Sequence, residues 1–367
     1  MAGIAFVVSF PMAGLMLTAS RKLGLVDPSG IESHKQHNRV VPNTGGVAIF
    51  AGLALPMAAG LLGVWLIPEA WWARNLPAVS EHLDGLRRST SMGGGVLTAV
   101  CVLHVMGLID DRRSLGAMLK LGVQLMVAVG LTTLCDVRAM QFMDSYGWWG
   151  PWVSGAVSVA WIVAIINAMN FLDNMDGLSG GVGAVIAGIY LAATLIGGQW
   201  FVAAMAALLL GSLLGFLAFN FPPARLFMGD AGSLVIGAVL AVISVRTTYF
   251  DPNSPVPTLG HWYGVLMPLM VLAIPIYDLT SVTLIRLRQG LSPFKGDHNH
   301  FSHRLVRRGL SERRAVLVVW ACTLACGLGG VVLGSLEQWQ AVVVACQTVA
   351  IIVMLAAMDS RGRGRRR

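Results

Sequence analysis

Six aspartates lie at the ends of long apolar runs or in the short loops between them: Asp110, Asp111, Asp173, Asp176, Asp230 and Asp278. A carboxylate at a membrane boundary is costly unless it has a partner or a task. The first five can be placed on one side of a membrane, and that side also carries most of the Lys and Arg residues. Carboxylates beneath a basic rim suit a divalent metal ion and a phosphorylated substrate. The pattern therefore predicts phosphate chemistry at one membrane face.

The adjacent pair Asp110 and Asp111 ends one apolar run, in the segment Gly-Leu-Ile-Asp-Asp. Neighbouring carboxylates repel each other and are tolerable where a cation neutralises them. Arg112 and Arg113 follow directly. They could neutralise the pair alone, so a solvated, charge-balanced turn is the alternative to a reactive site.

A second polar group recurs every three residues, at Asn167, Asn170, Asp173 and Asp176. On a helix this ladder winds slowly around one side, and the apolar residues between its members make a lipid-facing position improbable. Side chains with oxygen atoms suit hard cations such as Mg²⁺. A helix C-terminus with Asn and Gly as stop signals is the alternative; it explains Gly177 and Asn174, but not the whole ladder.

Two further loops carry polar side chains between apolar runs. Asp230 lies between Gly229 and Gly232, where a phosphate or a metal ion could approach the backbone closely; the alternative is that Asp230 is a helix N-cap. The segment 295–308 holds three His among Lys and Arg. Its His spacing and its lack of Cys argue against a zinc site. A phosphate-binding loop is the favoured interpretation, and a plain basic membrane-surface loop is the alternative.

The composition decides which elements must position these residues. The chain has 367 residues, is 56% hydrophobic and only 12% charged, and has a mean hydropathy of +0.70, which excludes an ordinary soluble domain. A spanning helix needs about 20 mostly apolar residues. Apolar runs of this kind predict an all-α, polytopic membrane bundle of about eleven spans, near 2–20, 45–68, 93–109, 117–135, 152–169, 180–197, 200–219, 231–248, 262–285, 315–335 and 339–358.

The distribution of charge predicts the orientation. Twenty of the 26 Lys and Arg residues fall in the alternate loops of one side, and five fall in the loops of the other. The positive-inside rule places the richer side in the cytoplasm, so the N-terminus is expected outside and the C-terminus inside. We expect one membrane domain over residues 1–367, with its site formed by the cytoplasmic loops 21–44, 109–116, 170–180, 220–230 and 286–314.

Taken together, the motifs resemble a known family, the polyprenyl-phosphate N-acetylhexosamine-1-phosphate transferases (glycosyltransferase family 4). The segments that carry the resemblance follow the family order over nearly the whole chain: His34-Lys-Gln-His37, Pro42-Asn-Thr-Gly-Gly46, Gly107-Leu-Ile-Asp-Asp111, Asn167-Ala-Met-Asn-Phe-Leu-Asp-Asn-Met-Asp-Gly-Leu178, Phe227-Met-Gly-Asp-Ala-Gly-Ser-Leu234 and Asp297-His-Asn-His-Phe-Ser-His-Arg-Leu305. The histidine segment is most similar to the branch that makes undecaprenyl-diphosphate-N-acetylglucosamine. It is less similar to the peptidoglycan branch, which uses a muramoyl-pentapeptide sugar.

Three positions depart from the family pattern. Ser302 stands where the pattern has a third histidine, and Asn43 stands where an arginine is common. The early Arg-Lys-x-His pattern begins with His34 instead. These differences leave the implied reaction class intact and weaken the inference about the donor sugar.

The resemblance implies that a lipid phosphate attacks a UDP-sugar and that UMP leaves. It implies Asp110 and Asp111 as catalytic residues and Asp230 and Asn170 as ligands of Mg²⁺, or of Mn²⁺. It also implies a substrate-binding set, which comprises Lys35, Lys120, Asp173, Asp176, His300, His303 and Arg304. Lys120 lies one turn inside its span, so a side chain that only reaches for the membrane surface is the alternative. Direct transfer and a covalent phosphosugar on an aspartate both remain open.

The expected partners are a UDP-N-acetylhexosamine, undecaprenyl or another polyprenyl phosphate and the lipid bilayer, without nucleic acid; a homodimer is left open. The expected location is the bacterial inner membrane, with the site on the cytoplasmic face. A UDP-MurNAc-pentapeptide phosphotransferase is the alternative within the family. A nucleotide-sugar transporter is the alternative from another class, but it would be expected to place charged groups near the middle of the membrane.

Overall fold

The structure, a computed structural model, describes residues 1–23, 41–247, 262–292, 300–333 and 336–360, and every regular element in these ranges is helical. The long helices are α1 (Ala2–Leu23), α2 (Gly45–Leu66), α6 (Thr90–Asp110), α7 (Ala117–Leu134), α8 (Gly150–Leu172), α9 (Leu178–Ile196), α10 (Trp200–Asn220), α11 (Asp230–Arg246), α13 (Ala273–Arg288), α15 (Glu312–Val332) and α16 (Gln338–Ser360). The shorter ones are α3 (Glu69–Asn75), α4 (Pro77–Ser80), α5 (Leu83–Arg88), η1 (Gln141–Tyr146), η3 (Trp262–Leu266), α12 (Met267–Val271) and α14 (Phe301–Arg307). The predicted all-helical class is confirmed.

The number of spans differs from the eleven expected. In the described ranges, nine helices are long and apolar enough to cross a membrane, and a pair of helices over 263–288, bent by 66°, could add a tenth. The remaining expected span corresponds to α11, which has 17 residues and is buried without a break from Ala231 to Val245. Because neighbouring helices cover α11 on every side, it lies in the interior of the bundle rather than against lipid.

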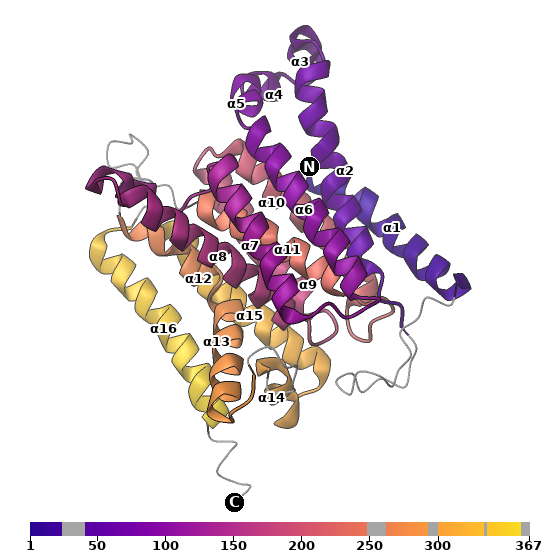
Figure 1. The fold of residues 1–367 in the computed structure, drawn as a ribbon, viewed down its shortest axis with the longest axis vertical. Coiled ribbons are helices and arrows are strands. Elements are labelled where there is room, and N and C mark those ends of the chain that lie inside the picture. The colour runs from indigo at the N-terminus through magenta and orange to yellow at the C-terminus, as the bar shows by residue number, and fades with distance from the viewer. Residues whose placement is uncertain (24–40, 248–261, 293–299, 334–335, 361–367) are drawn as a thin grey trace, which may run out of the picture.

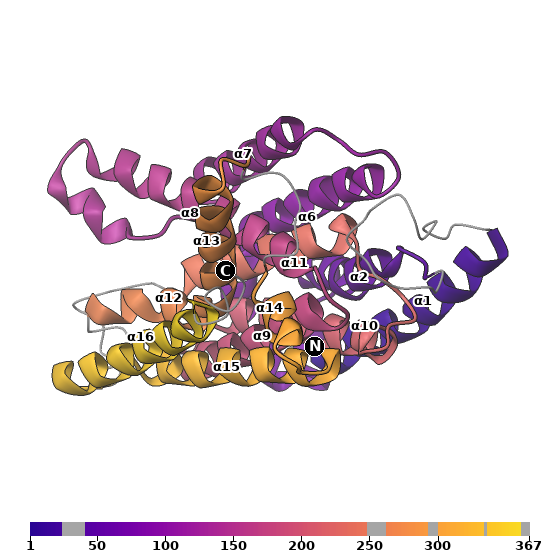
Figure 2. The same cartoon turned by 90° about the horizontal axis from the view of Figure 1, so that it is seen from below.

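Successive long helices run in opposite directions, so the motif loops gather at one end of the bundle. Figure 1 shows α3, α4 and α5 at the other end, and α14 near the end where the motif loops meet. The view from below in Figure 2 looks onto the end that carries α14. The orientation of this bundle in a membrane stays a prediction.

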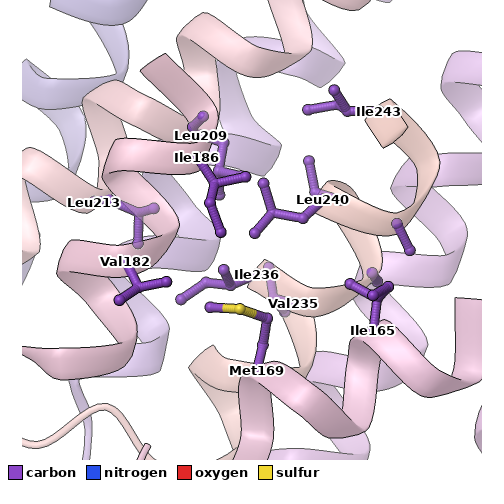
Figure 3. Close-up of a cluster of buried hydrophobic side chains, with 14 of the residues drawn as sticks. Ile165, Met169, Val182, Ile186, Leu209, Leu213, Val235, Ile236, Leu240 and Ile243 are labelled. Atoms are coloured by element: carbon purple, nitrogen blue, oxygen red, sulfur yellow. The ribbon is translucent and has the colours of Figure 1, made fainter. Parts of the chain in front are cut away.

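The central helix α11 positions the site. It packs against α2, α6, α8, α9 and α10, and Figure 3 shows part of the core that holds it: Val235, Ile236, Leu240 and Ile243 face Ile165 and Met169 of α8 and the apolar side chains of α9 and α10. Gly107 allows α6 to approach closely, since a Cβ there would lie 2.4 Å from the Cα of Ala231. The apolar core and this close approach therefore fix the N-terminus of α11 against the end of α6.

Candidate active site

A lysine bridges two carboxylates at the motif end of the bundle. The Lys120 Nζ atom lies 2.9 Å from Asp110 Oδ2 and 3.0 Å from Asp230 Oδ2. The three residues come from the last residue of α6, the first turn of α7 and the first residue of α11. Two carboxylates can share this small space because the ammonium group lies between them. Lys120 is therefore not a side chain that only reaches for the membrane surface.

The polar ladder of α8 faces the same cluster. Asn170 Nδ2 donates to Asp230 Oδ1 at 2.8 Å and to Ser233 Oγ at 3.0 Å. One turn earlier, Asn167 Nδ2 donates to Gln124 Oε1 of α7 at 2.6 Å. The ladder thus meets α7 and α11, as its apolar surroundings in the sequence suggest.

Asp111 fastens the N-terminus of α11. Its Oδ1 accepts the backbone N–H of Asp230 at 2.9 Å, and its Oδ2 accepts that of Ala231 at 3.2 Å. Asn43 Nδ2 donates to the same Oδ1 at 3.2 Å. The first N–H groups of a helix have no partner within it, so a carboxylate there supplies a cap. Asp230 itself is not the N-cap that the sequence allowed. Asp111, which directly follows α6, caps α11 instead, and the Asp230 carboxylate contacts Lys120 and Asn170.

The surroundings of Asp111 also change its acidity. Burial raises the pKa of its carboxyl to about 7, and the nearby negative charges of Asp230 and Asp173 act in the same direction. The backbone N–H groups of Asp230 and Ala231 oppose this change in pKa because they stabilise the ionised form. The charge of this cluster is therefore sensitive to pH near neutrality and to any cation that binds beside it.

The backbone before Asp230 requires glycine. Gly229 has φ +69°, and a Cβ there would lie 2.5 Å from both Asn43 Oδ1 and Asp111 Oδ2. Gly229→Ala should therefore destabilise the protein by about 1–3 kcal/mol and displace Asp230. Thermal unfolding of the purified protein measures this effect.

Gly290→Ala is the matched control, because Gly290 has the same φ of +69° with nothing within 4 Å of a Cβ. The difference between the two melting temperatures isolates the contact with Asn43 and Asp111. Equal changes in the two variants would contradict the assignment of Gly229 to the site.

The other two predicted carboxylates lie around the cluster in different ways. Asp173 follows α8 directly, and its charge acts on Asp111. Asp176 is buried, and its Oδ2 accepts the backbone N–H of Ala224 at 2.8 Å. Asp176 therefore fastens the loop after α8 to the loop after α10.

The described part of the histidine segment forms α14 beside α13. His300 and Arg304 are buried, and Arg304 donates to Ser281 Oγ of α13 at 3.1 Å. The ring of His303 lies 6.4 Å from the ring of His300. Lys35, also predicted to bind substrate, lies outside the described residues.

Two contributors to the N-terminal end of α11 were not among the predicted site residues: His104, which lies outside the motifs, and Ser233, which lies within the motif Phe227–Leu234. His104 of α6 places its Nδ1 atom 2.9 Å from the carbonyl oxygen of Ala231, and Ser233 receives the hydrogen bond from Asn170. The polar character of His104 within an apolar run is the signal that could have identified it. Its partner could not be identified, since the contact depends on how α6 crosses α11.

The side-chain oxygen atoms of Asp230 and Asn170 could hold a hard cation only together with further ligands. In the described ranges, no three His, Cys, Asp or Glu side chains are arranged to hold a metal ion. Asp230 and Asn170 nevertheless offer oxygen atoms, and Mg²⁺ commonly binds to one or two carboxylates together with water and substrate phosphates. Asn170 turns its Nδ2 toward Asp230. A cation bound by both residues therefore requires the amide to present Oδ1 instead.

Comparisons with known proteins point to one family. Residues 94–248 match the profile of glycosyl transferase family 4. The chain is 31% identical over 385 residues to the decaprenyl-phosphate N-acetylglucosaminephosphotransferase of Mycobacterium tuberculosis, which covers 98% of this chain and 88% of the relative. It is 29% identical over 344 residues to a probable undecaprenyl-phosphate N-acetylglucosaminyl 1-phosphate transferase of Bacillus subtilis, with 92% and 86% covered.

A third relative is the undecaprenyl-phosphate alpha-N-acetylglucosaminyl 1-phosphate transferase of Yersinia pestis. It is 26% identical over 349 residues, which cover 92% of this chain and 86% of the relative. These matches extend across the helices that carry Asp110, Lys120, Asn170 and Asp230. The chain therefore belongs to glycosyl transferase family 4.

Proposed function

We propose that this chain transfers N-acetylglucosamine-1-phosphate from UDP-N-acetylglucosamine to a polyprenyl phosphate and releases UMP. The observation that carries the proposal is the cluster of Asp110, Lys120 and Asp230, drawn from three helices at one end of a membrane bundle. The relatives with this activity in their names align over most of the chain. Undecaprenyl phosphate is the proposed acceptor, and the product would begin the synthesis of a cell-envelope polysaccharide.

The reaction joins two anions, and the site must offset their repulsion. An oxygen of the lipid phosphate forms a bond to the β-phosphorus of the nucleotide-sugar, and the bond from that phosphorus to the oxygen of UMP breaks. Lys120 can move from its two carboxylates to the diphosphate, where an ammonium group stabilises the developing charge. Asp110, released from Lys120, can accept a proton from the lipid phosphate.

Asp230 and Asn170 are the residues that would hold Mg²⁺ or Mn²⁺. Such an ion supplies positive charge to the phosphoryl oxygens when it is bound. Asp111 keeps Asp230 in place through the N-terminus of α11. The two neighbouring aspartates thus have different roles: Asp110 acts on the substrate, and Asp111 holds the N-terminus of α11.

The remaining predicted residues are proposed to bind substrate. Asp173 and Asp176 belong to the nucleotide pocket, directly or through the loops that they fasten. His300, His303 and Arg304 belong to the diphosphate and the sugar. Lys35 is proposed to add positive charge from the segment before α2.

The site is proposed to face the cytoplasm of a bacterium, across its inner membrane. One feature of the described chain supports this orientation. Arg112, Arg113 and Arg225 lie at the motif end of the bundle, and basic residues favour the cytoplasmic side. Exposed tryptophans such as Trp71 and Trp148 lie at the far end, which fits a membrane interface on either side.

A matched pair of cysteine variants tests this topology. Ser114 lies in the loop after Asp110, and Ser145 lies at the far end of the bundle; both are exposed. We expect an impermeant thiol reagent to label Ser145→Cys in intact cells and to label Ser114→Cys only after lysis. The unsubstituted chain sets the background, because it has cysteines of its own. Labelling of Ser114→Cys from outside would reverse the orientation.

The product released tests the proposed activity. Purified protein with polyprenyl phosphate and UDP-N-acetylglucosamine is expected to release UMP. Release of UDP would indicate transfer of the sugar alone, and movement of intact nucleotide-sugar into vesicles without UMP would indicate the transporter. Turnover of UDP-MurNAc-pentapeptide in place of UDP-N-acetylglucosamine would move the chain to the peptidoglycan branch.

A further inference from the structure

A buried aspartate outside the cluster is paired with a histidine of the proposed substrate site. Asp278 is fully buried within α13. Its Oδ2 lies 2.8 Å from Nδ1 of His300, and its Oδ1 accepts the backbone N–H of Phe301 at 2.7 Å. A buried carboxylate is costly unless it is hydrogen-bonded and paired. Both of its oxygens have such partners, and both partners lie at the start of α14.

The pairing decides how His300 is presented. A carboxylate accepts hydrogen bonds, so Asp278 requires the proton of the ring on Nδ1. The second nitrogen, Nε2, then lies on the opposite side of the ring. If that nitrogen also carries a proton, the carboxylate balances the positive charge inside the protein. The ring is then a charged donor that can bind a phosphate oxygen.

The position of the ring connects this pair to the proposed site. The rings of His300 and Phe171 meet in a T-shaped contact, with 6.1 Å between their centroids. Phe171 directly follows Asn170, which contacts Asp230. Ser302, two residues after His300, donates a hydrogen bond to Asn174 Oδ1 in the loop after α8. The start of α14 is therefore fastened to α13 on one side and to the end of α8 on the other.

We infer that Asp278 is a positioning residue, which holds His300 so that its Nε2 atom binds a phosphate oxygen of a substrate. The inference deepens the proposed function and rests on it. The phosphate oxygen could belong to the diphosphate of the nucleotide-sugar or to the lipid phosphate. Nucleotide affinity and the KM of the lipid distinguish these two sources.

The plain structural alternative is that Asp278 only caps α14 through Phe301. The two roles predict different outcomes when His300 is absent. A positioning residue has no effect on substrate once its histidine is gone, whereas a cap keeps its effect. A double-mutant cycle of Asp278→Ala and His300→Ala therefore separates them.

Each variant is tested by calorimetric binding of UDP and by the KM values of both substrates. We expect each single variant to weaken binding of one substrate by about 10–100-fold, the usual effect of losing a partner that orients a ligand. The double variant should bind no more weakly than His300→Ala alone. If the binding free energies lost in the two single variants added up in the double variant, the inference would be overturned. Thr280 is exposed on the same helix, and its hydroxyl donates to the carbonyl oxygens of Ile276 and Tyr277 one turn earlier, so Thr280→Ala should bind like the unsubstituted protein.

Asp278→Asn covers the case in which alanine variants do not fold. Asparagine keeps the shape and an acceptor oxygen but removes the charge, so it should remain folded and still bind substrate more weakly. Affinity equal to that of the unsubstituted protein would overturn the inference. Failure to release UMP from UDP-N-acetylglucosamine would instead count against the proposed function, because UDP binding is measured without turnover.

Discussion

Asp230→Asn is expected to lower kcat by about a thousandfold or more while the protein stays folded. The Asp230 carboxylate touches Lys120 and Asn170 together, and it is the charged ligand proposed for the metal ion. Asparagine has the same shape and can keep one hydrogen bond, but it brings no negative charge. The loss should therefore appear in catalysis and not in the melting temperature.

Release of UMP and thermal unfolding of the same preparation measure the two effects. Asp136→Asn is the matched control, since Asp136 pairs with Arg138 at the far end of the bundle. A chelator should silence the unsubstituted enzyme, and Mg²⁺ or Mn²⁺ should restore it. Full activity in excess chelator would contradict the metal ligands, and near-normal turnover of Asp230→Asn would contradict the central role of the cluster.

Asp110→Asn and Asp111→Asn should each lower kcat strongly, by about a hundredfold or more, with much smaller changes in UDP affinity. Asp110 acts on the lipid phosphate, and an interaction used mainly in the transition state appears in the rate rather than in binding. Asp111 affects the rate through Asp230, which it holds in place. Asp111→Asn should in addition lower the stability by about 1 kcal/mol, because it weakens the cap of α11. Asp110→Asn lacks this second effect.

Replacement of Asp173 or Asp176 provides the contrast, because these variants should weaken UDP binding first. Calorimetric binding beside single-turnover rates distinguishes the two groups, whereas lost turnover alone does not. If Asp110→Asn and Asp111→Asn both lost UDP binding while the residual complex reacted at the normal rate, this division of tasks would be wrong.

The local features of the chain were open to prediction from its sequence. Long apolar runs predict helices in a membrane, and polar residues at their ends predict which loops carry the site. The location of α11 was the exception. It is as apolar as the other long helices and was expected to be a membrane span, yet its 17 residues lie in the interior of the bundle. Hydropathy indicates that a segment avoids water, but it does not distinguish burial in lipid from burial in protein.

The contacts within the site could not be predicted in the same way. Lys120 and Asp230 are separated by 110 positions, and Asp278 and His300 by 22. Their pairing depends on which helices lie side by side and at what height, and the spacing along the chain does not contain that information. The sequence also allowed Asp230 to be its own helix cap. Only the approach of α6 to α11 gives this task to Asp111.

The fate of a labelled β-phosphate tests the central claim most directly. Purified enzyme would receive undecaprenyl phosphate and UDP-N-acetylglucosamine that carries ³²P only in its β-phosphate. We expect the label to pass into the organic phase with the lipid, the UMP formed to be unlabelled, and Asp230→Asn to transfer the label about a thousandfold more slowly or not at all. Label that remains in the aqueous phase as UDP, with unlabelled sugar on the lipid, would contradict it.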